Sequence, residues 1–345
     1  MKTFTMLLIS LLVLSLVLSA VSCGEEETTE PVTLRLAHGY TVGEVYDLEI
    51  QKFADLVEEY TDGLVTIDIY PASTLFRSYE LWEAVTTGAV DFYFDSAYYM
   101  ARFIPDLVIL WTEGMWSSWE HGFAVKDDGR LFDSLAQSIE AAGPVKVLGW
   151  PEEICINTIT ISKEKELFSR FDEEGLKMHA PPGAFPAPSS ELLNSTLIEV
   201  PYEEMYIALA QGIIDGATTS LPRYYGLKLY ELAPHACAAI MAYGSWVTMM
   251  NEDTWNGLST EVQDIIQNQV MPELLAYSRV AIQEYMDEVL AFAEEVSETY
   301  HVSTWDTHPE YYNGLRETST FKTMRLMPDP ELVEIVDNLN PMLQE

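Results

Sequence analysis

Basic side chains are scarce in this chain. Its 345 residues carry 18 lysines and arginines against 55 aspartates and glutamates, which gives a formal net charge of −37 at pH 7. A nucleic-acid surface needs clustered lysine and arginine to neutralise phosphates, so this balance argues against nucleic acid as a partner. It also disfavours an anionic membrane surface as the main partner. We interpret the acidic excess as a solubilising surface, because many carboxylates lie on the outer faces of expected helices.

Motifs of catalysis and of metal binding are also missing. The sequence contains neither GxSxG nor HExxH, and no spaced run of Asp and Asn ending in Glu resembles a calcium loop. An exported hydrolase built from Cys155, Cys237, His179 and His235 is the remote alternative. We therefore expect no enzyme activity, no metal and no cofactor.

The first 31 residues have the pattern of an export and tethering segment. Lys2 precedes an apolar stretch, residues 6–21, that is short for a membrane-spanning helix, and small residues then lead to Cys23. This pattern resembles a lipobox, so we predict a lipoprotein signal over 1–23 with lipid attached at Cys23; an ordinary signal peptide with an incidental cysteine is the alternative. Residues 24–31 are polar and acidic and predict a tether. We expect an extracytoplasmic protein, in the periplasm or on the outer face of the cell membrane.

The chain after the tether alternates apolar strand patterns with helical ones. Strands are expected at 33–40, 65–71, 90–96 and 145–150, and helices at 44–60, 78–87 and 129–142. Gly63 and Gly88 close the first two helices. Repeated strand-then-helix units with short loops predict an α/β layer with a parallel sheet.

A second α/β unit follows between Gly175 and Gly216. It begins with GLKMHAPPG, a short strand broken by Pro181 and Pro182, and continues through a small-residue helix, a strand, the helix 201–212 and the strand 213–220. Ligands of such layers bind at the carboxyl ends of the strands. Farther on, Thr260 to about Tyr300 is one long helical pattern. We predict a capping box of Thr260 with Gln263 at its start and a kink at Pro272.

These phrases together resemble the extracytoplasmic solute-binding proteins of TRAP transporters (tripartite ATP-independent periplasmic, DctP type). The resemblance is carried by YPAS with the following TLFRSYELWEAVTTGAVDF, by the GLK strand with its proline break, and by the turn DGATT. It extends from Thr33 to about Thr299. It implies an α/β, two-lobe, periplasmic-binding-protein-like fold with crossover strands, a central ligand cleft and a long bracing helix.

The resemblance also implies domain boundaries. We expect the first part of lobe 1 at 32–151, the first part of lobe 2 at 152–234, a return crossover that completes lobe 1 at 235–258, and the long helix with a C-terminal part of lobe 2 at 259–345. Cys155 and Cys237 then fall on strands that cross between the lobes. A disulfide between them and two separate buried thiols both stay open.

The expected ligand contacts gather where strands end at the cleft. The candidates are His38, Tyr40, Arg77, Asp95, Trp150, Asn157, His179, Tyr202, Thr218, Thr219 and Arg223. Several have a structural alternative: His38 satisfying a backbone group, Asp95 capping a helix, the aromatic residues packing in the core, and Arg77 and Arg223 lying on the solvated surface.

Several of these candidates depart from the family pattern. In the family, an arginine that pairs with the ligand's carboxylate stands where this chain has His179, and in several relatives a second arginine stands at the place of Asn157. Thr218 and Thr219 replace the usual Glu and Asn. Histidine offers one or two donors and a pH-dependent charge, whereas arginine offers a permanent fork. The ligand is therefore either a weakly charged or neutral polar molecule, or an acid held by a relocated arginine.

The resemblance implies the solute-binding component of a TRAP-type secondary transporter. Such a protein captures a small organic solute by lobe closure and delivers it to a small and a large integral membrane subunit. A monomer is expected. The alternative within the binding-protein class is a two-lobe binding lipoprotein of an ABC transporter or of a chemoreceptor.

Overall fold

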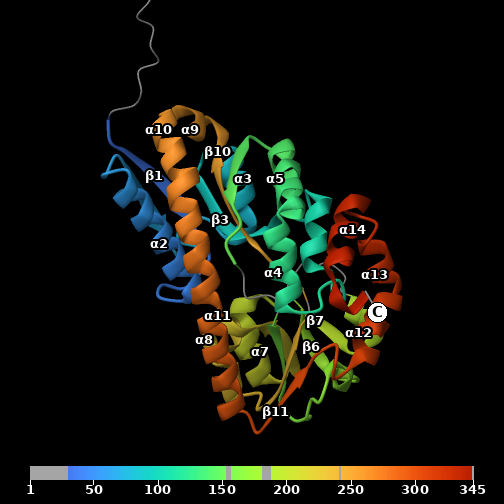
Figure 1. Cartoon of the computed structure of the whole chain (residues 1–345). Helices are drawn as coiled ribbons and strands as arrows, with labels where there is room; N and C mark the ends of the chain where they lie inside the picture. The colour runs from blue at the N-terminus through green and yellow to red at the C-terminus, as the bar shows by residue number, and fades with distance from the viewer. Residues whose placement is uncertain (1–29, 153–156, 181–187, 241, 344–345) are drawn as a thin grey trace, which may run out of the picture.

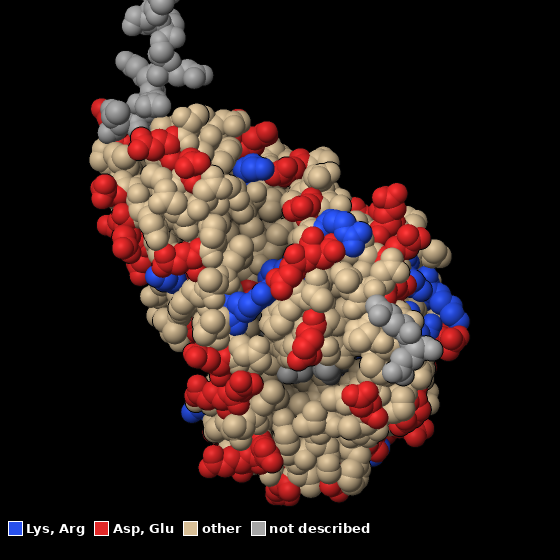
Figure 2. Space-filling view, viewed as in Figure 1, with Lys and Arg blue, Asp and Glu red and all other residues tan. Residues whose placement is uncertain are grey.

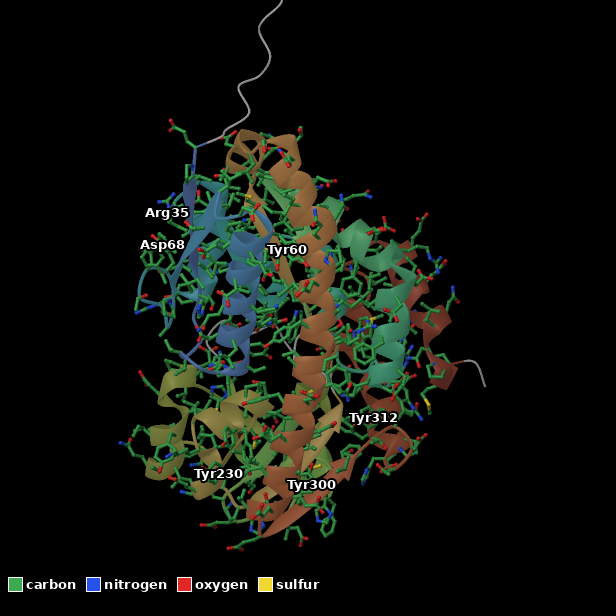
Figure 3. All side chains as sticks on the ribbon, turned by 60° about the vertical axis from the view of Figure 1, so that its left-hand side comes forward. Arg35, Tyr60, Asp68, Tyr230, Tyr300 and Tyr312 are labelled. Atoms are coloured by element: carbon green, nitrogen blue, oxygen red, sulfur yellow. The ribbon has the colours of Figure 1, made fainter. Side chains whose placement is uncertain are left out.

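The computed structural model describes residues 30–152, 157–180, 188–240 and 242–343. They form two lobes, each built on its own sheet, with helices packed around both sheets (Figure 1). The predicted α/β fold of two lobes is confirmed. Figure 3 shows the same division from another side, with Arg35 and Asp68 in one lobe and Tyr230 and Tyr300 in the other.

Lobe 1 is built on a five-stranded sheet of order β2-β1-β3-β10-β4. β1 runs parallel to β2 and β3, while β10 is antiparallel to both of its neighbours. The strands are β1 (Val32–Ala37), β2 (Val65–Tyr70), β3 (Phe92–Ser96), β4 (Val145–Gly149) and β10 (Trp246–Asn251), and the helices are α2 (Val45–Tyr60), α3 (Leu81–Thr86), α4 (Trp119–Asp128) and α5 (Arg130–Ala142). The expected strands and helices of this half are confirmed within a few residues at each end.

Helix α2 shows why these segments fold as predicted. Ile50, Phe53 and Val57 recur at helical spacing and are fully buried. The helix ends where Gly63, with a φ of 77°, takes up a left-handed conformation that glycine tolerates. The apolar stripe thus faces the sheet, and the next strand begins two residues later.

Lobe 2 is built on a six-stranded sheet of order β11-β9-β5-β8-β6-β7. The strands are β5 (Asn157–Ser162), β6 (Lys177–Ala180), β7 (Thr196–Glu199), β8 (Gly216–Ser220), β9 (His235–Ile240) and β11 (Thr299–Ser303), and the helices are α6 (Pro188–Leu192), α7 (Met205–Gln211) and α8 (Leu221–Gly226). β6 is parallel to β7 and β8, and β5 is antiparallel to β8 and β9. Because β4 precedes β5 and β9 precedes β10, the chain crosses between the lobes at these two points.

The long bracing helix is present, in three continuous pieces. α10 (Thr260–Ile265) leads through a π-helical turn, η7 (Ile266–Val270), into α11 (Met271–Val296), and the helix runs along both lobes (Figure 1). The π turn ends at Val270, two residues before Pro272, which has no N–H to donate. The predicted capping box is wrong: Ser259 caps α10 by accepting from the Val262 N–H at 3.2 Å, because the helix begins at Thr260 itself.

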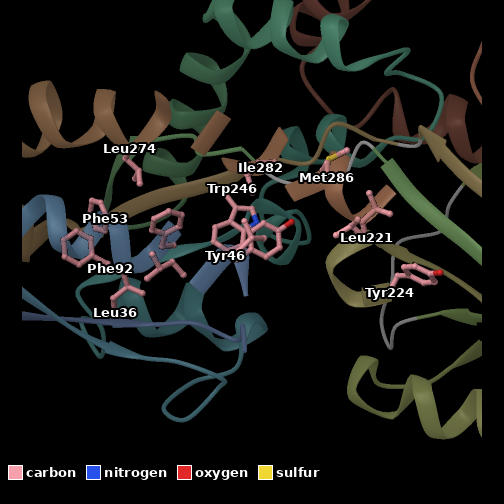
Figure 4. Close-up of a cluster of buried hydrophobic side chains, with 14 of the residues drawn as sticks. Leu36, Tyr46, Phe53, Phe92, Leu221, Tyr224, Trp246, Leu274, Ile282 and Met286 are labelled. Carbon is pink, nitrogen blue, oxygen red and sulfur yellow. The ribbon is translucent and has the colours of Figure 1, made fainter. Parts of the chain in front are cut away.

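A continuous apolar cluster joins the lobes under this helix. Leu274, Ile282 and Met286 of α11 are buried between Phe53 on the lobe 1 side and Leu221 on the lobe 2 side (Figure 4). Burying such side chains stabilises each by about 1.5–3 kcal/mol relative to exposure. The lobes are therefore attached to one shared helix as well as to each other by two crossovers.

The C-terminal segment differs from its expected place. α12 (Pro309–Glu317) packs against α6, and α13 (Ser319–Met324) also contacts α6, but α14 (Pro330–Leu339) packs against α4 and α5 of lobe 1. Phe321, Leu332 and Val336 belong to the lobe 1 core. The C-terminal part thus spans both lobes, because its apolar faces meet the uncovered sides of α4 and α5. β11, for which no strand was expected, lies in the lobe 2 sheet.

Acidic side chains are spread over the visible face of the molecule, and basic ones are few and separate (Figure 2). Carboxylates outnumber basic groups on both lobes in this view, which agrees with a solubilising role for the acidic excess. Within the described ranges, no helix combines the length and the apolarity that crossing a membrane would require.

Candidate functional site

Two side chains of lobe 1 meet at the carboxyl ends of β1 and β3. Tyr40 donates its hydroxyl to Asp95 Oδ1 at 2.5 Å, and the Ser96 N–H donates to the same oxygen at 2.7 Å. The Tyr40 ring packs against Trp246 with centroids 4.6 Å apart. Asp95 is fully buried, and its second oxygen, Oδ2, makes no close hydrogen bond among the described residues. Burial raises the pKa of this carboxyl, against the lowering effects of the Tyr40 bond and of the nearby Ser78 hydroxyl.

His38 lies behind this pair. It is fully buried, its Nε2 is 3.3 Å from Asp47 Oδ1, and its Nδ1 accepts from the Tyr40 N–H at 3.2 Å. Burial lowers its pKa to about 4, although Asp47 opposes the shift. His38 therefore orients Tyr40 as a neutral ring, and its contact with a ligand stays a prediction.

On the lobe 2 side, His179 of β6 donates Nε2–H to the Val200 carbonyl at 2.9 Å. Its other ring nitrogen, Nδ1, is buried without a hydrogen-bond partner. The ring packs against Tyr202, centroid to centroid at 5.2 Å. Burial lowers the pKa of His179, and the nearby Arg223 charge adds to this. The ring is therefore neutral near pH 7, and its free nitrogen is an acceptor.

Arg223 completes this side. It projects from the short helix α8, and its guanidinium carbon lies 4.1 Å from the centre of the Tyr202 ring, a cation–π contact. Tyr202 thus contacts both Arg223 and His179. No hydrogen bond or ion pair joins the guanidinium to another described residue. A partly buried arginine with all of its donors unused is rare unless a ligand or water takes them up.

The charge of Arg223 acts across the boundary between the lobes. Burial alone would lower the pKa of Arg223, but Tyr99, Tyr40 and Glu44 of lobe 1, together with Tyr202, raise it, so the side chain stays charged. Burial raises the pKa of Glu44, against the lowering effect of Arg223. We call the group Tyr40, Asp95, His179, Tyr202 and Arg223 the inter-lobe site.

Thr219 lies on the same face of the lobe 2 sheet as His179. Met178 pairs with Gly216 in parallel strands, and side chains alternate, so His179, Ala217 and Thr219 share a face. Thr219 is buried, and its hydroxyl has no hydrogen-bond partner. Thr218 faces the other way, where its Oγ1 contacts Thr160 Oγ1 at 3.0 Å.

Two further predicted contacts are not members of the inter-lobe site as defined above. Trp150 is in the lobe 1 core, with its ring edge-on to Phe132 at 5.2 Å. Arg77 is exposed and donates to the Tyr79 hydroxyl at 2.7 Å. Both positions correspond to the structural alternatives for these residues.

Other predictions fall outside the described residues. Cys23, Cys155 and the side chain of Asn157 belong to this group. Cys237 is buried on β9 and forms no disulfide with a described residue, and burial raises the pKa of its thiol to about 12. Its strand register places it opposite Thr160. The pairing of Cys155 with Cys237 stays a prediction.

The sequence did not identify three residues that act where the lobes meet. Tyr99 and Glu44 lie close enough to Arg223 to act on its charge, and Glu113 joins the lobes by accepting from Arg170 at 3.3 Å and from the Ser189 N–H at 3.0 Å. The aromatic run beginning at Tyr98 was the signal for Tyr99. Glu44 and Glu113 carried none, because they are two among 55 acidic residues. Within the described ranges, no cluster of three or more His, Cys, Asp or Glu is arranged to hold a metal ion.

Comparison with known proteins is consistent with this architecture. Residues 36–315 match the family model described as bacterial extracellular solute-binding protein, family 7. The C4-dicarboxylate-binding periplasmic protein DctP of Rhodobacter capsulatus is 24% identical over 276 residues, which cover 78% of this chain and 80% of that protein. An uncharacterized protein, y4mM, of Sinorhizobium fredii is 29% identical over 200 residues, 58% of this chain but 36% of that longer relative.

A solved structure shares the fold. The sugar acid binding protein DctPAm of Advenella mimigardefordensis, in complex with galactonate, superposes with a TM-score of 0.78 at 20% identity and covers 90% of this chain and 98% of that one. At this identity the likeness concerns the fold alone.

Proposed function

The chain belongs to the bacterial extracellular solute-binding proteins of family 7, and on that premise we propose that its ligand is a small organic acid whose carboxylate pairs with Arg223. As a TRAP-type solute-binding protein it is extracytoplasmic, binds a small organic solute and works with membrane subunits. The relatives and their family are binding proteins, not enzymes.

The observation that carries the proposal is that the guanidinium of Arg223 makes a cation–π contact with Tyr202 but no hydrogen bond or ion pair with the residues that the structure describes. A carboxylate that takes both of its donor edges forms a fork of two charge-assisted hydrogen bonds. Tyr202 fixes the plane of the guanidinium from one side. His179 stands where the resemblance to the family places an arginine, and Arg223 on α8, the helix after β8, supplies the positive charge instead.

Closure of the lobes follows from the position of Arg223. Arg223 belongs to lobe 2, while Tyr40 and Asp95 belong to lobe 1. A ligand that contacts both sets binds the closed arrangement better than an open one, and this difference in affinity drives closure. The closed protein then delivers its ligand to the small and large membrane subunits. We propose that it does so as a monomer held to the membrane by lipid at Cys23.

The test compares Arg223→Gln with a matched control, Arg77→Gln, which removes an exposed arginine outside the inter-lobe site. Native mass spectrometry of purified protein identifies the bound solute, and calorimetry then measures its affinity for the three proteins. Loss of a bidentate charged contact should weaken an acid by roughly 10–100-fold in Arg223→Gln and leave Arg77→Gln unchanged. A neutral solute, or an acid bound equally by Arg223→Gln, would refute the proposal. An altered mass of the ligand after incubation would indicate an enzyme.

A further inference from the structure

Three buried polar atoms in and beside the inter-lobe site have no hydrogen-bond partner among the described residues. They are His179 Nδ1 and Thr219 Oγ1 on lobe 2 and Asp95 Oδ2 on lobe 1. The three residues are each at least 95% buried. A buried polar atom that makes no hydrogen bond loses its hydration without compensation, so a ligand or water usually satisfies it.

His179 Nδ1 is the most informative of the three, because its chemistry is fixed. The opposite nitrogen must carry the proton, since it lies 2.9 Å from a carbonyl oxygen, which is an acceptor only. The ring is neutral, so Nδ1 holds a lone pair and accepts a hydrogen bond. A hydroxyl of threonine or a protonated carboxyl could donate or accept, but Nδ1 can only accept.

The neighbours of Nδ1 define what can reach it. The Tyr202 ring packs against both His179 and Arg223. Its centre is 5.2 Å from the centre of the His179 ring and 4.1 Å from the guanidinium carbon of Arg223. An anionic group bound at Arg223 therefore has the His179 acceptor within the span of a small molecule. The Arg223 charge also makes this place unfavourable for a second cation.

We propose that His179 selects a hydroxylated organic acid: the carboxylate binds Arg223, and a hydroxyl of the same ligand donates to His179 Nδ1. The proposal rests on the proposed function, because it presumes the acid at Arg223. It adds His179 to the proposed function as a specificity-determining residue. Simple carboxylates without a donor leave Nδ1 unsatisfied, and amino acids place an ammonium near the arginine charge.

The probes are acids that share a skeleton and differ in one group. Lactate carries a hydroxyl, 2-methoxypropionate an ether, propionate a hydrogen and alanine an ammonium; galactonate and hexanoate repeat the hydroxylated and unsubstituted cases on a longer chain. Dialysed wild-type protein is measured by calorimetry with each acid. We expect the hydroxy acids to bind roughly tenfold more tightly than the matched ether, hydrogen and ammonium compounds, which corresponds to one hydrogen bond.

Two substitutions separate the two nitrogens. His179→Gln places its amide nitrogen near the position of Nε2, so the bond to the Val200 carbonyl is kept while the acceptor at Nδ1 is lost. His179→Asn places its amide oxygen near Nδ1 and gives up the bond to Val200. The preference for the hydroxy acid should vanish in His179→Gln and persist, with weaker binding overall, in His179→Asn. If either variant fails to fold, the wild-type comparison of hydroxyl with ether still decides.

The outcomes distinguish this inference from the proposed function. If no acid binds, or if Arg223→Gln binds all acids as well as wild type, both are overturned. If acids bind through Arg223 but the ether, hydrogen or ammonium compound binds as tightly as the hydroxy acid, the role of His179 alone is overturned. A hydroxyl preference that survives in His179→Gln overturns it too.

Discussion

A buried group of charges where the lobes meet offers a direct test of the packing described above. Arg170 of the short helix η4 (Arg170–Glu173) donates to Glu173 Oε1 at 2.5 Å and to Glu113 Oε1 at 3.3 Å. Glu113 comes from lobe 1, and Arg170 and Glu173 from lobe 2. The side chain of Arg170 is 6% exposed, that of Glu113 8% and that of Glu173 1%. Replacing Arg170 with methionine keeps the volume and removes the cation between two carboxylates.

The expected loss follows from this burial. Breaking a buried ion pair by removing one partner costs about 3–5 kcal/mol, because the remaining charge stays desolvated and uncompensated. Here two carboxylates remain. A loss of this size is a large share of a typical stability of about 5–15 kcal/mol. Arg170→Lys should lose less, because it keeps the charge and gives up only the fork.

Urea unfolding followed by circular dichroism at pH 7 measures the effect. Arg130→Met is the control: its pair with Asp128 is exposed, and its stability should stay near wild type. A deficit below about 1 kcal/mol for Arg170→Met would show that the buried triad is not held as described.

Two further predictions concern His38 and Cys23. Burial lowers the pKa of His38 from 6.5 to about 4. Between these two pH values His38 is protonated in the unfolded chain but not in the folded chain. The free energy of unfolding therefore decreases as pH falls from 6.5 toward 4, by up to roughly 3 kcal/mol from this group. The difference in unfolding free energy between wild type and His38→Gln, measured from pH 7 to pH 4, isolates this contribution, and parallel profiles would contradict it. Replacing Cys23 with alanine should move the expressed protein from the membrane fraction to the soluble fraction on immunoblots, whereas Cys237→Ala should stay with the membrane; retention of Cys23→Ala would contradict a lipid anchor.

Much of the fold could be predicted because its signals are local. The apolar spacing in α2, the glycine that ends it and the strand pattern before Tyr70 are each contained within a few residues. The long helix could also be predicted from the sequence. Its cap was misplaced by one residue, since Ser259 and Thr260 are both suitable caps and only the backbone shows which one lies outside the helix.

The site was predictable in part. Tyr40, Asp95, His179, Tyr202 and Arg223 were named from their places at strand ends, and the structure brings them together. Trp150 was named by the same reasoning and lies in the core. A strand end specifies a location along the sheet, but the direction of a side chain depends on what packs around it.

The sequence by itself determined the class of this protein: an acidic, exported α/β chain of two lobes without the marks of catalysis. Tertiary structure alone decided that the Arg223 guanidinium makes no hydrogen bond or ion pair with the described residues, and that His179 bonds the Val200 carbonyl through one nitrogen and leaves the other open. The physical reason is the range of the interactions. Helices and strands follow from neighbours a few residues apart, whereas charge, burial and the pairing of a donor depend on residues tens of positions away, such as Val200 for His179 and Asp95 for Tyr40.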